Sequence, residues 1–117
     1  MGAERTAAVR RGEIWTVSGA PGFGSKPRPV LIVQSERLSG AQTVLACGFT
    51  SQPNFAVPFR PSIAPSSENG LERPCKVMVE KLAAVSRTKL GKLVGKLAED
   101  DMEAVERALH LVLGFAG

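Results

Sequence analysis

The hydrophobic residues of this chain change their spacing near residue 98. Before that position they form short runs separated by turn-forming Gly, Pro, Ser and Asn residues, which is typical of β-strands. After it, Met102, Val105, Leu109, Val112 and Leu113 recur at the three- or four-residue spacing of an amphipathic helix. We therefore expect a mainly β, α+β fold, in which a small, strongly curved sheet or barrel packs against one terminal helix.

Six runs are predicted as strands, at residues 13–17, 30–34, 43–49, 56–60, 75–85 and 92–97. The run at 30–34 is apolar without alternation, which predicts burial on both faces. Residues 35–40 are expected to turn or to form a short helix. The segment 61–70 is turn-like and ends in Asn69-Gly70, a dipeptide typical of two-residue hairpins.

The predicted terminal helix carries Glu99, Asp100 and Asp101 in its first turn, where the helix dipole favours negative charge. Ala98 occupies the cap position, so no side chain is expected to cap the helix there. Gly114 is expected to end the helix.

The composition is that of an ordinary globular domain, with 44% hydrophobic and 22% charged residues among 117. We expect a disordered N-terminal extension at residues 1–9 and a single domain over residues 10–117. No apolar run approaches the ~20 residues of a membrane helix, and no signal peptide is visible. A soluble, cytoplasmic protein is therefore expected.

Few side chains offer metal-binding or acid–base chemistry. Cys47 and Cys75 lie far apart and are expected to be reduced, mostly buried thiols, with a single disulfide as the alternative. With one histidine they supply too few ligands for a zinc site. That histidine, His110, falls on the polar side of the helix and is expected to be exposed and inert. The chain has no tyrosine, so acid–base chemistry has to proceed without either residue.

Charge is segregated along the chain, whose net charge is +4 and whose pI is near 9.5. Residues 73–96 hold seven basic side chains and one acid, Glu80, whereas residues 98–106 hold five acids and no base. A basic sheet face is suited to a phosphate backbone. The alternative is that these lysines only solubilise exposed strand positions.

The most specific chemical signal is Arg28, which lies between Pro27 and Pro29 at the mouth of the apolar run 30–34. The prolines restrict the backbone, and the planar guanidinium suits a phosphate because it donates two parallel hydrogen bonds. Thr50 directly follows the next predicted strand, so Arg28 and Thr50 could face one pocket if these strands are neighbours. The Gly-rich loop at 18–27 lacks the spacing of a phosphate-binding loop. It is either a mobile loop beside an active site or a plain surface loop.

Several stretches, in this order, resemble the MazF/PemK family of toxin–antitoxin ribonucleases. They are RRGEIWTV (10–17), KPRPVLIVQ (26–34), GFTSQ (48–52), NGLERP (69–74), VMVEKLAAVSRTKLGKLVGKL and DDMEAVERAL, and the resemblance covers about residues 10–115. The segment QPNFAVPF departs from many relatives, which keep more polar residues there. The resemblance implies that the loops in this region determine which RNA sequence is cleaved, so the cleavage motif of relatives does not carry over to this chain.

The resemblance implies a small SH3-like β-barrel of the MazF/CcdB type with a C-terminal α-helix, acting as a homodimer in the cytoplasm. It implies a toxin that cleaves single-stranded RNA, chiefly messenger RNA, sequence-selectively and with no cofactor or metal. Attack of the 2′-hydroxyl would give 2′,3′-cyclic phosphate and 5′-hydroxyl ends, inhibiting translation and growth. Arg28 and Thr50 correspond to the family's catalytic arginine and threonine. The implied protein partner is an acidic-tailed, MazE-like antitoxin.

Loop and strand residues around this pair are the candidates for RNA contacts, with aromatic rings offering surfaces on which bases stack. They are Phe23, Ser25, Lys26, Ser51, Gln52, Phe55 and Lys81, whereas Trp15 and Phe49 are assigned to the core. The alternative is a non-catalytic, CcdB-like toxin that binds a protein target such as a topoisomerase. That toxin would not need the Arg28–Thr50 pair.

Overall fold

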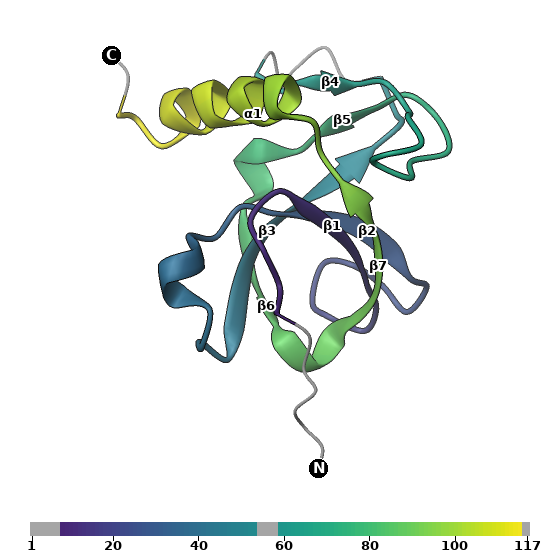
Figure 1. Ribbon diagram of the computed structural model, residues 1–117, viewed down its shortest axis with the longest axis vertical. Helices are drawn as coiled ribbons and strands as arrows, with labels where there is room; N and C mark the ends of the chain where they lie inside the picture. The colour runs from purple at the N-terminus through teal and green to yellow at the C-terminus, as the bar shows by residue number, and fades with distance from the viewer. Residues whose placement is uncertain (1–7, 54–58, 116–117) are drawn as a thin grey trace.

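The computed structural model describes residues 8–53 and 59–115, which form a curled antiparallel sheet with one helix across its end (Figure 1). The strands are β1 (Glu13–Val17), β2 (Arg28–Ile32), β3 (Thr43–Thr50), β4 (Ser62–Ile63), β5 (Cys75–Val77), β6 (Ala83–Ser86) and β7 (Leu90–Lys96). Short 3₁₀ turns are η2 (Glu36–Leu38), η3 (Val79–Lys81) and η4 (Arg87–Lys89), and the helix is α1 (Glu99–Val112). The predicted mainly β fold with a C-terminal helix is confirmed.

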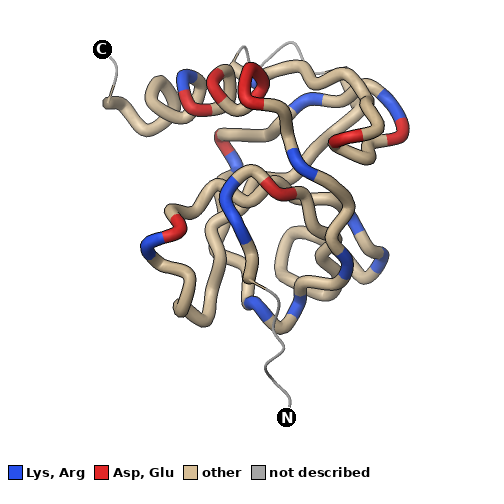
Figure 2. Tube along the Cα trace, viewed as in Figure 1, with Lys and Arg blue, Asp and Glu red and all other residues tan. Residues whose placement is uncertain are grey.

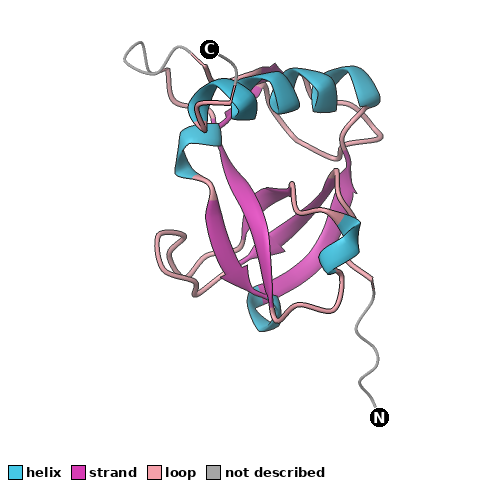
Figure 3. Ribbon diagram, turned by 90° about the vertical axis from the view of Figure 1, so that its left-hand side faces the viewer, coloured by secondary structure: helices cyan, strands magenta, loops and turns pink. Residues whose placement is uncertain are grey.

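The strand order is β4-β5-β3-β2-β1-β7, and β6 also pairs with β3. All of the pairings are antiparallel. Strand β2 therefore lies between β1 and β3 in the middle of the sheet, and Figure 3 shows the sheet curling below the helix. Arg28 and Thr50 belong to neighbouring strands, as the sequence interpretation required.

Two hydrophobic cores lie on opposite faces of the central strands. Ile14, Leu31 and Cys47 pack with Val105 and Leu109 of α1 in one core. The alternate residues of the same strands pack with β6 inside the curl of the sheet, in a core of Val9, Trp15, Val17, Ala20, Val30, Ile32, Val44, Ala46 and Val85. The two cores explain why the run around β2 is apolar without alternation, since each face of the strand is buried.

The terminal helix matches its prediction closely. It runs over Glu99–Val112, its cap residue Ala98 makes no side-chain hydrogen bond, and Gly114 follows it with φ of +81°. Val105, Ala108 and Leu109 are its buried residues, and His110 is exposed. Arg11 ties the sheet to the helix, because its Nη2 lies 2.7 Å from Oε2 of Glu106 and its Nη1 donates to the carbonyl of Val33.

The long strand predicted at 75–85 is wrong, because η3 divides it into β5 and β6. Phe49 pairs with Val77 and Ala46 with Ala83, so the four residues 46–49 of β3 oppose the seven residues 77–83 of the partner segment. The three extra residues turn at η3 and bury Val79 in the core beneath α1. The sequence pattern does not reveal this interruption, because the residues on both sides of it favour strands.

Three further predictions of local structure need correction. Residues 56–58 lie outside the described residues, and Phe59 and Arg60 are not in a strand. Instead β4 falls inside the segment predicted to be turn-like, because Ile63 is buried in the core and pairs with Cys75. Asn69-Gly70 does not form a two-residue hairpin, since residues 64–74 together join β4 to β5. Smaller shifts affect β2 and β7, which begin two residues before the predicted positions.

The segregation of charge in the sequence becomes a spatial one in the fold (Figure 2). Acidic residues gather on α1, and lysines and arginines are spread over the sheet and its turns. The sheet therefore offers its exposed edges and loops to an anion, and the helix does not.

Candidate active site

Arg28 and Thr50 meet at the edge where β2 begins and β3 ends. Val30 pairs with Gly48, and continuing this antiparallel register by two residues places Arg28 opposite Thr50. Residues two positions apart point to the same face of a strand, so both side chains extend from the face that carries Val30 and Ile32 further along β2. The two strands are neighbours and both residues line one hollow, whereas the catalytic roles assigned to the pair stay predictions.

Three hollows meet at this pair. Hollow A, of about 490 Å³, runs from Arg28 and Thr50 towards the loop at residues 70–73. Hollow B, of about 420 Å³, lies between the pair and the loop around Phe23. Hollow C, of about 450 Å³, lies beyond Thr50 towards Pro53 and Ile63. Thr50 lines all three and Arg28 lines A and B, so the pair stands at the junction of one extended groove.

The Gly-rich loop orients Arg28. Within it, the Gly19 N–H donates to Gly24 O at 2.7 Å and the Phe23 N–H donates to Ala20 O at 3.0 Å, so the loop folds back on itself. The carbonyl of Phe23 then accepts a 3.0 Å hydrogen bond from Nε of Arg28. The guanidinium is exposed, and with its Nε bonded, its two terminal amino groups remain available for a phosphate. Of the two interpretations of this loop, the one that places it beside the site fits the structure.

Thr50 is held by the residues that follow it. Its Oγ1 accepts a 3.1 Å hydrogen bond from the backbone N–H of Gln52, in a tight turn that ends the strand. Because a hydroxyl is also a donor, Thr50 keeps a proton to donate towards the groove.

The structure brings together most of the predicted RNA-contacting residues. Phe23 and Lys81 line hollow B, Ser51 lines hollows A and C, and Gln52 lines hollow C. Ser25 and Lys26 are exposed on the loop but line none of the three hollows. Phe55 lies outside the described residues. Trp15 is buried in the core as predicted, whereas Phe49 packs against the core and also lines hollows A and B.

Gly48 provides the floor of hollow B. A Cβ atom at this position would lie 3.1 Å from Cε of Met78 and 3.4 Å from Cε1 of Phe23. Glycine therefore lets the Phe23 ring and the Met78 side chain approach the strand. Together they give hollow B an apolar wall, of the kind on which a nucleobase stacks.

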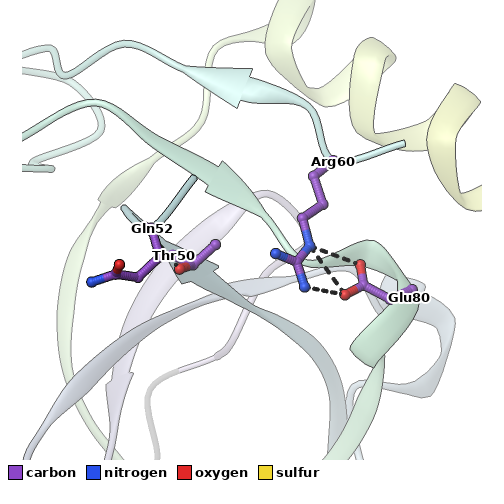
Figure 4. Close-up of polar contacts among 4 residues, drawn as sticks. All are labelled: Thr50, Gln52, Arg60 and Glu80. Carbon is purple, nitrogen blue, oxygen red and sulfur yellow. Dashed lines mark hydrogen bonds and ion pairs between the residues drawn. The ribbon is translucent and has the colours of Figure 1, made fainter. Parts of the chain in front are cut away.

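No sequence pattern singled out the partly buried ion pair between Arg60 and Glu80. Nε of Arg60 donates to both carboxylate oxygens of Glu80, at 3.2 and 3.0 Å, and its Nη2 also donates to Oε2 (Figure 4). The Arg60 side chain is only 5% exposed. The hydrogen bonds from Arg60 lower the pKa of Glu80, and the same bonds raise the pKa of Arg60. The pair joins the segment after Thr50 to η3, which carries Lys81.

Neither cysteine offers a reactive thiolate. Both are free thiols, and burial, with a smaller contribution from Glu80, raises the pKa of Cys47 to about 12. Burial also raises the pKa of Cys75, which lines hollows A and C. Among residues 8–53 and 59–115, no three His, Cys, Asp or Glu side chains are grouped so as to hold a metal ion. No helix in the same residues has the length and apolar character needed to cross a membrane.

The curled sheet and its helix form a fold that is shared with solved structures. One is an endoribonuclease in complex with its cognate antitoxin from a mycobacterial species, with a TM-score of 0.78 at 22% identity, covering 94% of this chain and 99% of that one. Another is MazF from Deinococcus radiodurans, with a TM-score of 0.75 at 18% identity, covering 92% of this chain and 98% of that one. At these identities the likeness establishes the fold, a curled antiparallel half-barrel with one C-terminal helix, which agrees with the mainly β fold expected from the resemblance.

The sequence establishes the family. The model of the "PemK-like, MazF-like toxin of type II toxin-antitoxin system" family matches residues 10–113. A probable endoribonuclease MazF of Mycolicibacterium smegmatis is 38% identical over 93% of this chain and all of its own length. Endoribonuclease MazF9 of Mycobacterium tuberculosis is 28% identical over 90% of this chain and 96% of its own length. The chain belongs to the PemK/MazF family of type II toxin–antitoxin toxins, and its class of enzyme is endoribonuclease.

Proposed function

We propose that this toxin cleaves single-stranded RNA, chiefly messenger RNA, in the groove at Arg28 and Thr50, without a metal ion, and thereby inhibits translation and growth. The observation that carries the proposal is the position of this pair at the junction of hollows A, B and C. A strand of RNA that follows the groove passes over both side chains.

The proposed reaction is a transesterification within the RNA chain. The 2′-oxygen forms a bond to the adjacent phosphorus and loses its proton, the bond from phosphorus to the 5′-oxygen breaks, and that oxygen takes up a proton. The products are a 2′,3′-cyclic phosphate and a 5′-hydroxyl. Arg28 stabilises the charge on the phosphorane through two parallel hydrogen bonds, and Thr50 donates to the same oxygens. Such preorganised donors typically contribute about 10²–10³ in rate each.

Residues along the groove are proposed to hold the nucleotides on either side. The ring of Phe23 stacks a base in hollow B, where Lys81 meets a backbone phosphate. Ser51 and Gln52 donate and accept hydrogen bonds at the edge of hollow C. Ser25 and Lys26 are proposed to contact RNA from the exposed loop, and Phe55 stays a sequence-based candidate.

We further propose that residues 10–117 form a single toxin domain and that the toxin acts in the cytoplasm as a homodimer. A small antitoxin with an acidic tail is proposed to neutralise it. Two of the solved structures of similar fold are complexes of such toxins with antitoxins, one from a mycobacterial species and one from Deinococcus radiodurans. An acidic tail is complementary to the charge of the sheet and groove, where Arg28 and Lys81 lie.

The proposal is tested by incubating the purified protein with a long single-stranded RNA in excess chelator. We expect discrete fragments whose 5′-hydroxyl ends a kinase labels without prior phosphatase treatment, and their sequences give the cleavage motif. The Arg28→Ala variant is expected to lose the activity. Arg37→Ala is the matched control, because Arg37 is exposed on η2 and lines none of the three hollows.

Intact RNA from folded wild-type protein, over several unrelated sequences, would overturn the proposal. It would turn attention to the non-catalytic alternative, a toxin that binds a protein target.

A further inference from the structure

Hollow A contains a second arginine that the proposed reaction does not use. Arg73 lines this hollow together with Arg28, Thr50 and Ser51, and it is exposed. The ion pairs among the described residues join Arg11 to Glu106 and Arg60 to Glu80, and neither pair involves Arg73. Like Arg28, it precedes a proline, which restricts its backbone to extended conformations.

The loop that presents Arg73 is unusually well fixed for an 11-residue connection between β4 and β5. Asn69 at its centre is 2% exposed. Its Oδ1 accepts from the N–H groups of Ser66 at 3.0 Å and Leu71 at 2.9 Å, and its Nδ2 donates to Ala64 O at 2.9 Å. One buried side chain thus pairs with three backbone groups of the loop and ties them together.

The same loop is pressed onto β7. Lys96 N–H donates to Glu68 O at 3.0 Å, and a Cβ atom on Gly70 would lie 2.5 Å from Val94 O. Gly70 also has φ of +71°, a conformation that other residues rarely adopt. Arg73 therefore extends from a rigid support, with little backbone entropy to lose when a ligand binds.

We propose that Arg73 is a binding residue for a second RNA phosphate, in hollow A, next to the phosphate held by Arg28. The proposal deepens the proposed function and rests on it. A single-stranded RNA backbone repeats its phosphates at every nucleotide, and hollow A is lined by two arginines that share one open space. Glu72 lines the same hollow, and its carboxylate repels phosphate, so Arg73 has to bind the phosphate against this repulsion. An arginine on a fixed loop thus places the neighbouring nucleotide and sets the register of the RNA over Thr50.

The decisive experiment pairs a protein substitution with a substrate substitution. An RNA oligonucleotide containing the mapped cleavage site is made with one phosphate at a time, on either side of the cleaved linkage, replaced by an uncharged methylphosphonate. We expect Arg73→Ala to raise KM for unmodified RNA about tenfold with kcat changed less than about twofold, as for a lost phosphate contact outside the reacting centre. At one position, the methylphosphonate should raise the KM of the wild type by the same factor as Arg73→Ala does. The same methylphosphonate should leave the KM of the Arg73→Ala variant unchanged.

A binding measurement separates this proposal from the proposed cleavage. Single-stranded DNA of the same sequence lacks the 2′-hydroxyl and stays intact, so its affinity can be followed against salt concentration. Loss of one phosphate contact should reduce the slope of log K against log salt by about 0.7. Arg73→Lys should keep most of this slope, and Arg37→Ala should keep all of it.

Two results would overturn the role of Arg73. The first is that Arg73→Ala has the same KM and salt slope as Arg37→Ala. The second is that Arg73→Ala raises KM further for every methylphosphonate substrate, so that no single phosphate accounts for its effect. Failure of the proposed function looks different, since wild-type protein would then leave RNA intact while the DNA salt slope still depended on Arg73.

Discussion

Nε of Arg28 donates a 3.0 Å hydrogen bond to the carbonyl oxygen of Phe23. This bond joins the first residue of β2 to the loop that lines hollow B, and it leaves the two terminal amino groups of the guanidinium free beside the groove that Thr50 also lines. A lysine at this position would keep the charge but could neither make this bond nor grip a phosphate with two parallel donors.

Arg28→Lys is therefore expected to lower kcat/KM for RNA at least about 100-fold, because the transition-state contact loses its geometry. The free energy of unfolding should stay within about 0.5 kcal/mol of the wild type, since the side chain is exposed. Initial cleavage rates and urea denaturation measure the two quantities. Activity close to wild type in the lysine variant would argue that Arg28 acts only as a point charge.

The hydroxyl of Thr50 can be removed at nearly constant shape. Thr50→Val should reduce kcat by about 10²-fold, because it deletes a donor at the junction of the hollows. Thr50→Ser keeps the hydroxyl and the bond to the Gln52 N–H, so it should retain most of the activity. Single-turnover cleavage of the two variants distinguishes them, and equal losses in both would point to the methyl group instead.

The Arg60–Glu80 pair predicts a pH-dependent stability. Because the folded state lowers the pKa of Glu80 below its ordinary value of 4.5, the ionised carboxylate stabilises the fold above that pH. The contribution declines as the pH falls through the folded-state pKa, where the carboxylate becomes protonated. Glu80→Gln should lose about 1–3 kcal/mol of unfolding free energy at pH 7 by leaving Arg60 without its ionic partner.

Urea denaturation at a series of pH values checks this. The difference in free energy of unfolding between wild type and Glu80→Gln should be largest at pH 7 and shrink as the pH falls below about 4.5. Glu103→Gln is the matched control, because Glu103 is exposed on α1. A difference that persists unchanged at low pH would show that packing, and not the charge, is responsible.

Asn69→Ala should destabilise the protein by about 2–4 kcal/mol, because it leaves the Ser66 and Leu71 N–H groups and the Ala64 carbonyl without their buried partner. Thermal or urea unfolding measures the loss. Ser67→Ala, at an exposed position in the same loop, is the control and should change stability by less than about 0.5 kcal/mol. A small effect of Asn69→Ala would mean that water replaces the side chain, and that the loop is less fixed than its hydrogen bonds indicate.

The two thiols should differ in reactivity. Burial raises the pKa of Cys47 to about 12, so at pH 8 almost none of it is thiolate and its side chain is also shielded. Alkylation of native protein followed by mass spectrometry should modify Cys75, which is half-buried, before Cys47. Both should react in urea, and fast native labelling of Cys47 would contradict its burial in the core.

The sequence by itself determined the elements that depend only on residues close together in the chain. The spacing of Val105 and Leu109 identified the helix and its buried face, and Gly114 its end. The apolar run after Arg28 identified a strand buried on both faces, and the prolines beside Arg28 identified it as a candidate site residue. The residues that carry the family resemblance lie in the same stretches, so the enzyme class and the candidate catalytic pair could be predicted from the sequence.

Only the tertiary structure decided what depends on pairing between distant segments. The register of β2 against β3 brings Arg28 to Thr50, and the three extra residues opposite β3 break the predicted long strand at η3. The ion pair of Arg60 with Glu80 and the position of Arg73 in hollow A join segments far apart in the chain. Such contacts depend on strand register and loop closure, and local residue preferences contain no information about either.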